Sequence, residues 1–248
     1  MELWTLEHTR TLLPTTVAMV LLALVLRLWL GKKSLRIRMI PFQVATCLLL
    51  ALEVGKQVLS LRQGYDLYHL PFHYCSLFLF ALPPMAFYRG KYEQTVRAVA
   101  TSMCAAMFLL LMIYPNLIYS AGNIQEFFTN YFSFHTVAYH NLVVLIFLLI
   151  LALDLYSPGE KGEHKAVILA MVVFCIVSAS MAHILKTNYA NYYSCNIPVL
   201  ETVRLAVAAA IGVFVAKLVY ILIVSALNIL FTWGAFGLCR LVKRPKKV

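Results

Sequence analysis

The chain is short of charge. Only 12% of its 248 residues are charged, and ten of them are acidic. Soluble domains of ordinary composition carry about 25% charged residues. Hydrophobic residues instead make up 62% of the chain, and the mean hydropathy is +0.82. This composition excludes a soluble globular domain and predicts an integral membrane protein.

The sequence also lacks the patterns of several membrane and secreted classes. Its apolar runs are continuous and do not alternate with a period of two, which favours helices over a transmembrane β-barrel. No internal repeat is evident, so an inverted-repeat transporter is not supported. None of the six cysteines form a C-x-x-C pair, which excludes a disulfide framework and the usual zinc spacings.

The apolar runs predict an all-α, polytopic membrane protein with seven transmembrane helices in a single domain over residues 1–248. The last apolar region is too long for one span of about 20 residues. Splitting it into two spans would place the basic C-terminal tail outside, so we expect one span followed by an interfacial helix. The expected spans are 12–30, 40–61, 70–88, 98–119, 131–153, 166–185 and 199–226, and the interfacial continuation is 227–242.

Basic residues are concentrated between the apolar runs, and the net charge is +11. Lys32, Lys33, Arg36 and Arg38 follow the first span, which makes that loop cytoplasmic. The N-terminus is therefore expected outside and the C-terminus in the cytoplasm. The basic loops are expected to contact anionic headgroups, with membrane lipids as the partners. No basic stripe is interleaved with aromatic residues, so nucleic acid is not expected as a partner.

Polar residues gather at the opposite side of the predicted membrane. Five of the seven histidines fall in the outer half, and the inner half of the spans is almost entirely apolar. Ionisable groups at membrane depth are costly and mark functional sites. The pattern predicts a polar cavity open to the outer leaflet of the cell membrane. Its expected members include Glu53 and Lys56, which share a helix face and can pair, and also Asn141, Asn188 and Tyr189.

Three side chains are candidates for chemistry. His140 lies about 13 Å into its predicted helix at 1.5 Å per residue, and Cys75 would become a nucleophile if His140 acted as its base. His73 is the third candidate. The alternatives are that His140 and Cys75 only pack, and that the tyrosines near Asn188 form an interfacial aromatic belt. The alternative of a metal site has little support, because no H-E-x-x-H motif is present and the only H-x-x-x-H spacing, His69 to His73, straddles Pro71 and does not lie on a regular helix, so neither metal nor cofactor is expected.

Three motifs resemble a known family. Pro71-Phe72-His73-Tyr74-Cys75 resembles the P-L-H-x-C-type motif of the bacterial YwaF family, and Ala138–Val144 and Thr187-Asn188-Tyr189 also fit it. That family is similar to eukaryotic transmembrane protein 164. The resemblance covers about Leu70 to Arg204.

The resemblance implies a seven-span protein and an acyltransferase that moves fatty acyl chains between phospholipids with a cysteine and a histidine. The histidine matches His140. Alignment on Pro71 puts the cysteine at Phe72, three residues before Cys75, so His73 is a candidate for part of the role.

Two functions therefore remain open. One is a lipid acyltransferase or lipid hydrolase that acts on outer-leaflet phospholipids through His140, Cys75 and His73. The other is a transporter, or a non-enzymatic protein that binds a lipid or small molecule in the same cavity. A structural subunit would leave the one-sided distribution of histidines without a reason.

Overall fold

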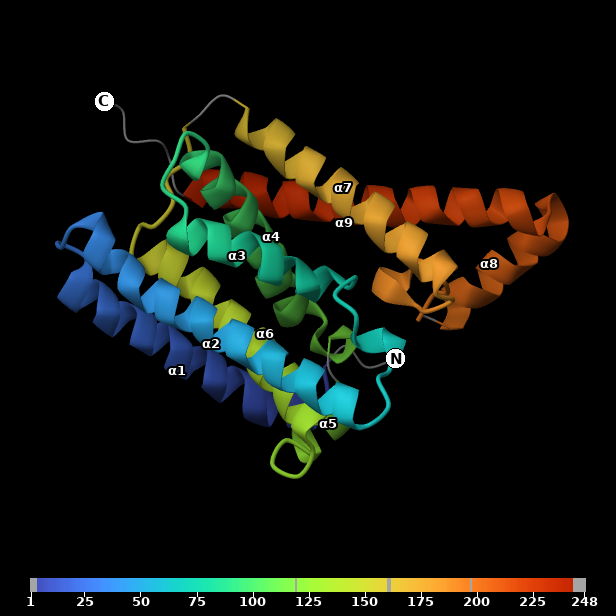
Figure 1. Cartoon of the computed structure of the whole chain (residues 1–248), viewed down its shortest axis with the longest axis horizontal. Helices are drawn as coiled ribbons and strands as arrows, with labels where there is room; N and C mark the ends of the chain where they lie inside the picture. The colour runs from blue at the N-terminus through green and yellow to red at the C-terminus, as the bar shows by residue number, and fades with distance from the viewer. Residues whose placement is uncertain (1–3, 119, 160–161, 197, 243–248) are drawn as a thin grey trace.

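The computed structural model describes residues 4–118, 120–159, 162–196 and 198–242, and this part of the chain contains helices and loops but no strand. Figure 1 shows the α-helices as a slanted bundle. Short 3₁₀ helices η1 to η4 interrupt the connections at Leu67–His69, Tyr74–Ser76, Pro115–Leu117 and Tyr189–Asn191. The α-helices are α1 Leu6–Leu30, α2 Leu35–Arg62, α3 Leu77–Phe87, α4 Glu93–Ile113, α5 Ala121–Gln125, α6 Tyr131–Ala152, α7 Glu163–Ile184, α8 Pro198–Ile211 and α9 Val213–Val242.

Six of the described helices are long and apolar enough to cross a membrane, namely α1, α2, α4, α6, α7 and α9. The predicted span 70–88 differs. Its apolar helical part covers only Tyr74–Phe87, which is shorter than the roughly 20 residues that a bilayer requires. Pro71 explains the difference, because a proline disfavours helical dihedrals in the residue before it. Leu70 is extended at φ −63° and ψ 148°, and His73 is extended at φ −80° and ψ 159°.

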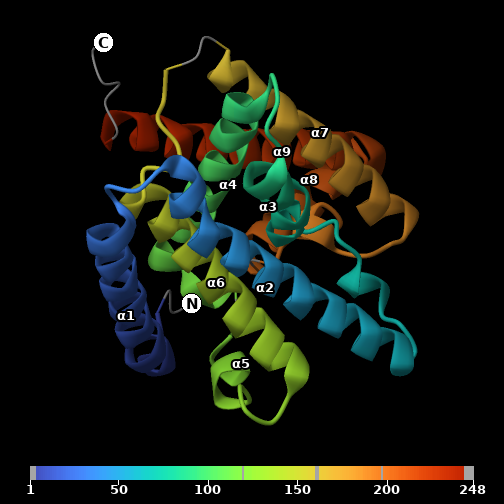
Figure 2. The same ribbon diagram turned by 60° about the vertical axis from the view of Figure 1, so that its left-hand side comes forward.

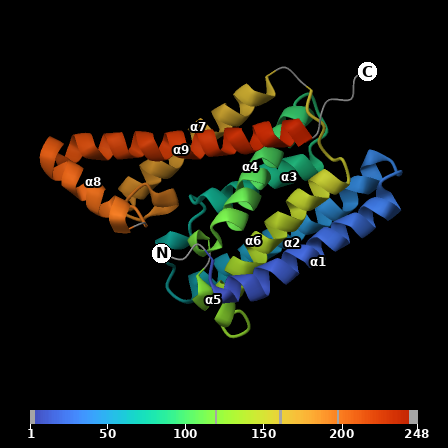
Figure 3. The ribbon, with the colours of Figure 1, turned by 180° about the vertical axis from the view of Figure 1, so that it is seen from behind.

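Helix α4 lies at the centre of the bundle. It contacts α3, α6, α7 and α9, while α1 and α2 lie side by side with α6 on one flank (Figures 1 and 3). Small residues on α4 allow this close packing, since a short side chain lets helix backbones approach. Its buried positions include Ala98, Ala100, Ser102, Cys104, Ala105 and Ala106. Helix α5 packs against the start of α6, at the end of the bundle where Figure 2 shows it.

One end of the bundle, here called the basic end, joins the α1–α2 turn, the α3–α4 turn and the α6–α7 loop. Three arginines from different helices donate to carbonyl groups at the end of α6 and just beyond it. Those carbonyls have no partner within the helix, and positive charge there is favoured by the helix dipole. The bonds are Arg27 Nη1 to Ala152 O at 2.7 Å, Arg38 Nη1 to Leu153 O at 2.7 Å, and Arg97 Nη1 to Leu155 O at 3.1 Å.

The last apolar region also differs from the prediction. We expected one helix over 199–226, but the chain breaks at Gly212, whose φ of +89° suits glycine and ends α8. Residues beyond the break form one continuous helix, α9, and 227–242 belongs to it. Helix α9 returns to the basic end, where Arg240 lies 3.8 Å from Glu163 of α7 and Trp233 Nε1 donates to His164 Nδ1 at 3.0 Å.

Helices α2 and α6 approach closely at Gly55. An added Cβ at this residue would lie 2.1 Å from the hydroxyl oxygen of Tyr131 on α6, which donates to Leu52 O at 3.2 Å. Gly55→Ala should therefore lower the free energy of unfolding by about 1–2 kcal/mol, because Tyr131 must move. Equilibrium unfolding in mixed micelles would measure this. In a Tyr131→Phe background the same substitution should be neutral or stabilising, since alanine has the higher helix propensity. Equal losses in both backgrounds would contradict this account.

Candidate functional site

The opposite end of the bundle, here called the histidine end, contains a buried ionic cluster centred on Glu53 of α2. The Glu53 carboxylate lies 2.8 Å from Lys56 Nζ through Oε1 and 3.2 Å from His135 Nε2 through Oε2. Gln57 Nε2 donates to the same Oε1 at 2.7 Å. The side chains of Glu53, Lys56 and His135 are only 11%, 15% and 9% exposed. We call Glu53, Lys56, Gln57 and His135 the Glu53 cluster.

The Glu53 cluster holds the loop between α2 and α3 in place. Gln57 Nε2 also donates to His69 O at 2.8 Å, and its Oε1 accepts from Tyr65 OH at 2.7 Å. The His69 ring lies 2.7 Å from Ser60 Oγ through Nδ1 and stacks on Phe132 of α6 with ring centres 4.8 Å apart. Burial lowers the pKa of His69. The loop is thus fixed to both α2 and α6 before the chain reaches Cys75.

His140 is held inside α6 by a contact to its own helix. Asn130 caps this helix by accepting from Phe132 N at 2.9 Å. One turn before His140, Thr136 O lies 2.6 Å from His140 Nδ1. A carbonyl can only accept, so Nδ1 carries the proton in the neutral ring and Nε2 is the nitrogen that can take up another. This is the tautomer that a general base requires.

Cys75 is linked to α6 through Tyr139. Cys75 is a free cysteine and is partly exposed, and it lies in the short helix η2 that follows the non-helical segment 70–73. The Tyr139 hydroxyl donates to Cys75 O at 3.1 Å. The Tyr139 ring lies 5.7 Å from the His140 ring and 5.2 Å from the His135 ring. Tyr139 therefore touches Cys75, His140 and His135 together.

His73 faces a different set of partners. Its Nε2 lies 3.1 Å from Tyr68 O, and its ring is 4.4 Å from the Tyr68 ring and 5.2 Å from the Tyr189 ring. Burial lowers the pKa of His73, which favours the neutral ring. Tyr189 is itself buried, and its hydroxyl donates to Leu67 O. His73 thus packs between Tyr68 of η1 and Tyr189 of η4, while Cys75 contacts α6.

Asn188 forms hydrogen bonds within the loop in which it lies. Its Nδ2 donates to Asn196 Oδ1 at 2.9 Å, and its Oδ1 accepts from Tyr193 N at 3.2 Å and Ser194 N at 3.1 Å. Both ends of the amide are therefore occupied by the connection between α7 and α8. In this arrangement Asn188 shapes the loop that carries Tyr189.

An apolar groove of about 500 Å³ lies between α1, α2 and α6. Asn141, the residue after His140, lies along it. Asn141 Nδ2 donates to Val137 O at 2.9 Å, and its Oδ1 is buried without a hydrogen-bond partner among the described residues. The other residues along the groove are Met19, Leu48, Ala51, Leu52, Tyr131, Phe134, Ala138, Leu142 and Leu145. A groove of this composition suits a hydrocarbon chain.

Sequence reasoning left out three members of this site, namely Gln57, His135 and Tyr139. Gln57 lies four residues after Glu53, and Tyr139 lies four residues after His135, so each pair shares a helix face. That spacing is the signal that would have found them. Among the described residues, no group of three or more His, Cys, Asp or Glu side chains is arranged to hold a metal ion.

Comparison with known proteins identifies a family. The profile of the TMEM164 family matches residues 3–233, which is most of the chain. No curated protein and no solved structure matched the chain in the same comparisons. Together with the six long apolar helices, the family match makes this an integral, multi-pass membrane protein.

Proposed function

Because this chain belongs to the TMEM164 family, we propose that it is a membrane-embedded lipid acyltransferase or lipid hydrolase that acts on phospholipids at the histidine end of the bundle. The charge distribution predicts that this end faces the outer leaflet. The observation that carries the proposal is the hydrogen bond from Tyr139 to Cys75 O, because it ties the segment of the thiol to the residue beside His140. The tautomer of His140, which carries its proton on Nδ1 and can accept another on Nε2, also supports the proposal.

The proposed reaction begins at the Cys75 thiol. His140 Nε2 takes the thiol proton, and the sulfur attacks the ester carbonyl of a phospholipid. The C–O bond to the glycerol then breaks, and the leaving oxygen takes the proton back from His140. The products of this half-reaction are a lysophospholipid and an acyl thioester on Cys75. In the second half, His140 takes a proton from a lysophospholipid hydroxyl or from water, whose oxygen attacks the thioester and releases the thiol.

The groove beside Asn141 is the proposed place of the acyl chain. Its wall is formed almost entirely of aliphatic and aromatic side chains, and it begins one residue from His140. An acyl chain lying there would bring its ester end toward the histidine end. Asn141 Oδ1 supports this placement, because an acceptor without a partner suits the hydroxyl of an incoming lysophospholipid.

The remaining polar residues are assigned to the headgroup. Lys56 is a cation at the histidine end that the buried carboxylate of Glu53 holds in place, so it would attract the lipid phosphate. His73 presents its Nδ1 as an acceptor, since its Nε2 is engaged by Tyr68 O. Tyr189 supports the His73 ring, and Asn188 holds the loop of Tyr189. At the other end of the bundle, the basic loops would contact anionic headgroups.

Lipid mass spectrometry tests this function. The purified protein would be incubated with a phosphatidylcholine and a lysophospholipid whose acyl chains differ in mass, and both the lipids and the intact protein would be analysed. New mixed-chain phospholipid together with an acyl mass on Cys75 is the expected result for transfer, and free fatty acid is expected for hydrolysis.

A matched control separates this reaction from mere binding. Cys75→Ala should lose both the products and the acyl mass, whereas Cys47→Ala, which removes an exposed thiol of α2, should keep them. Retained lipid without any turnover in the wild type would refute the enzyme and favour a transporter or lipid-binding protein.

A further inference from the structure

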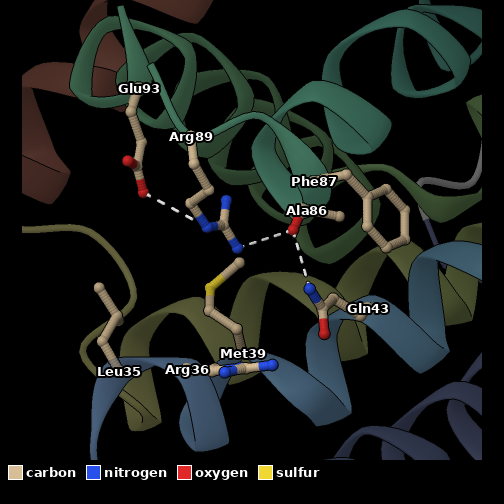
Figure 4. Close-up of a pocket in the computed structure, with 8 residues that line it drawn as sticks. All are labelled: Leu35, Arg36, Met39, Gln43, Ala86, Phe87, Arg89 and Glu93. Carbon is tan, nitrogen blue, oxygen red and sulfur yellow. Dashed lines mark hydrogen bonds and ion pairs between the residues drawn. The ribbon is translucent and has the colours of Figure 1, made fainter. Parts of the chain in front are cut away.

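A second pocket, of about 590 Å³, opens at the basic end, far along α2 from the Glu53 cluster. Its lower wall in Figure 4 is the start of α2, and its upper wall is formed by the end of α3 and the turn into α4. At its back, Ala86 O accepts from Gln43 Nε2 at 3.0 Å and from Arg89 Nη2 at 2.8 Å. The bond from Gln43 joins α2 to the end of α3, and the bond from Arg89 holds the turn that follows α3, so the two together give the pocket a fixed shape.

Positive charge exceeds negative charge around this pocket. Glu93 is its only lining carboxylate, and that group is bound closely by Arg97 and lies 3.7 Å from Arg89 Nε. Arg36 is exposed on the opposite wall, and in the described part of the chain no carboxylate lies within ion-pair distance of it. Lys32, Lys33 and Lys91 are exposed nearby in the chain and add to the positive potential.

The rest of the pocket is apolar. Leu35, Met39 and Phe87 line it, and Phe87 is 54% exposed. Ile40 and Val44, each one residue beyond a lining residue of α2, are 51% and 54% exposed and continue the apolar surface of that helix. A small soluble anion would leave this apolar surface uncovered. A lipid would cover it, because its phosphate could meet the arginines while its first methylenes lie against Met39 and Phe87.

We propose that this pocket binds one anionic glycerophospholipid from the leaflet at the basic end, with its headgroup phosphate between Arg36 and Arg89. The charge rule makes this the cytoplasmic leaflet. The site is separate from the proposed reaction at the histidine end and does not depend on it. A lipid bound here bridges α2 to α3 and α4, so its binding stabilises the folded protein as any ligand of the native state does.

Native mass spectrometry in detergent tests the site. The wild type would be titrated with phosphatidylglycerol and, separately, with phosphatidylcholine. Arg36→Gln is the informative variant, because Arg36 is exposed and no hydrogen bond of its side chain is seen among the described residues. Arg62→Gln is the matched control, since Arg62 is an exposed arginine at the other end of the same helix. We expect the first phosphatidylglycerol to bind at least about fivefold more weakly to Arg36→Gln and unchanged to Arg62→Gln.

Two further measurements identify the ligand. Phosphatidylcholine should bind the wild type more weakly than phosphatidylglycerol does, with no dependence on Arg36. Glycerol 3-phosphate at the same concentration should not displace the lipid. Displacement by glycerol 3-phosphate would overturn the lipid and leave a soluble phosphate as the ligand. Equal binding of phosphatidylglycerol to the wild type and Arg36→Gln would overturn the site itself.

Discussion

His140→Ala is expected to lower lipid turnover by about 10³-fold or more while the protein still folds. In the proposed reaction, His140 accepts and returns a proton in each half, and general acid–base catalysis by one positioned group contributes typically 10²–10⁴-fold. His140→Gln should be as inactive, although its amide can still donate to Thr136 O in place of the ring. Product formation per amount of folded protein, measured by lipid mass spectrometry, gives the comparison.

Variants of Cys75 test which group gives its proton to His140. If the thiol is the nucleophile, Cys75→Ser and His140→Ala should lose turnover to a similar extent, because residues that act as a unit are not additive. The double variant should then be no worse than either single variant. Full activity in Cys75→Ala beside an inactive His140→Ala would instead place the attack on water or the lipid hydroxyl. Full activity in His140→Ala would remove the histidine from the mechanism.

Much of the fold could be predicted from the sequence because long apolar runs constrain a membrane chain strongly. Five expected spans overlap the long helices α1, α2, α4, α6 and α7. The positions at which the helices start or break were harder to predict. Pro71 stood at the predicted start of a helix, where proline is often tolerated, but here Leu70 and His73 on either side of it are extended. Gly212 lay inside an unbroken apolar run, and only its positive φ reveals the end of α8.

The candidate site shows the same division between local and long-range information. The spacing of Glu53 and Lys56 predicted a pair, and the structure has that pair at 2.8 Å. The approach of His135 to Glu53 could not be predicted, because it depends on how α2 packs against α6. The bond from Tyr139 to Cys75 O likewise joins residues 64 positions apart. A single sequence identifies the polar residues of such a cavity but not which of them meet.

Glu53→Ala should be the most destabilising single change at the histidine end. It removes the carboxylate shared by Lys56 and His135, whose side chains are only 15% and 9% exposed. Breaking a buried ion pair by removing one partner costs about 3–5 kcal/mol, since the other charge stays buried without compensation. Equilibrium unfolding in mixed micelles would measure the loss. Asp154→Asn is the control, because its pair with Arg27 is 51% exposed on both sides and should contribute less than about 1 kcal/mol.

Removing both charges of the Glu53–Lys56 pair distinguishes the contribution of this pair to stability from that of the rest of the Glu53 cluster. If the loss comes from the buried Lys56 ammonium, Glu53→Ala with Lys56→Met should be more stable than Glu53→Ala alone, because methionine fills similar space without charge. Gln57 still joins α2 to His69 O in both variants, so the loop to Cys75 keeps that anchor. A loss below about 1 kcal/mol in Glu53→Ala would show instead that water reaches the cluster. The Glu53 cluster would then be part of an open polar cavity, in which Lys56 is already accessible to a lipid phosphate.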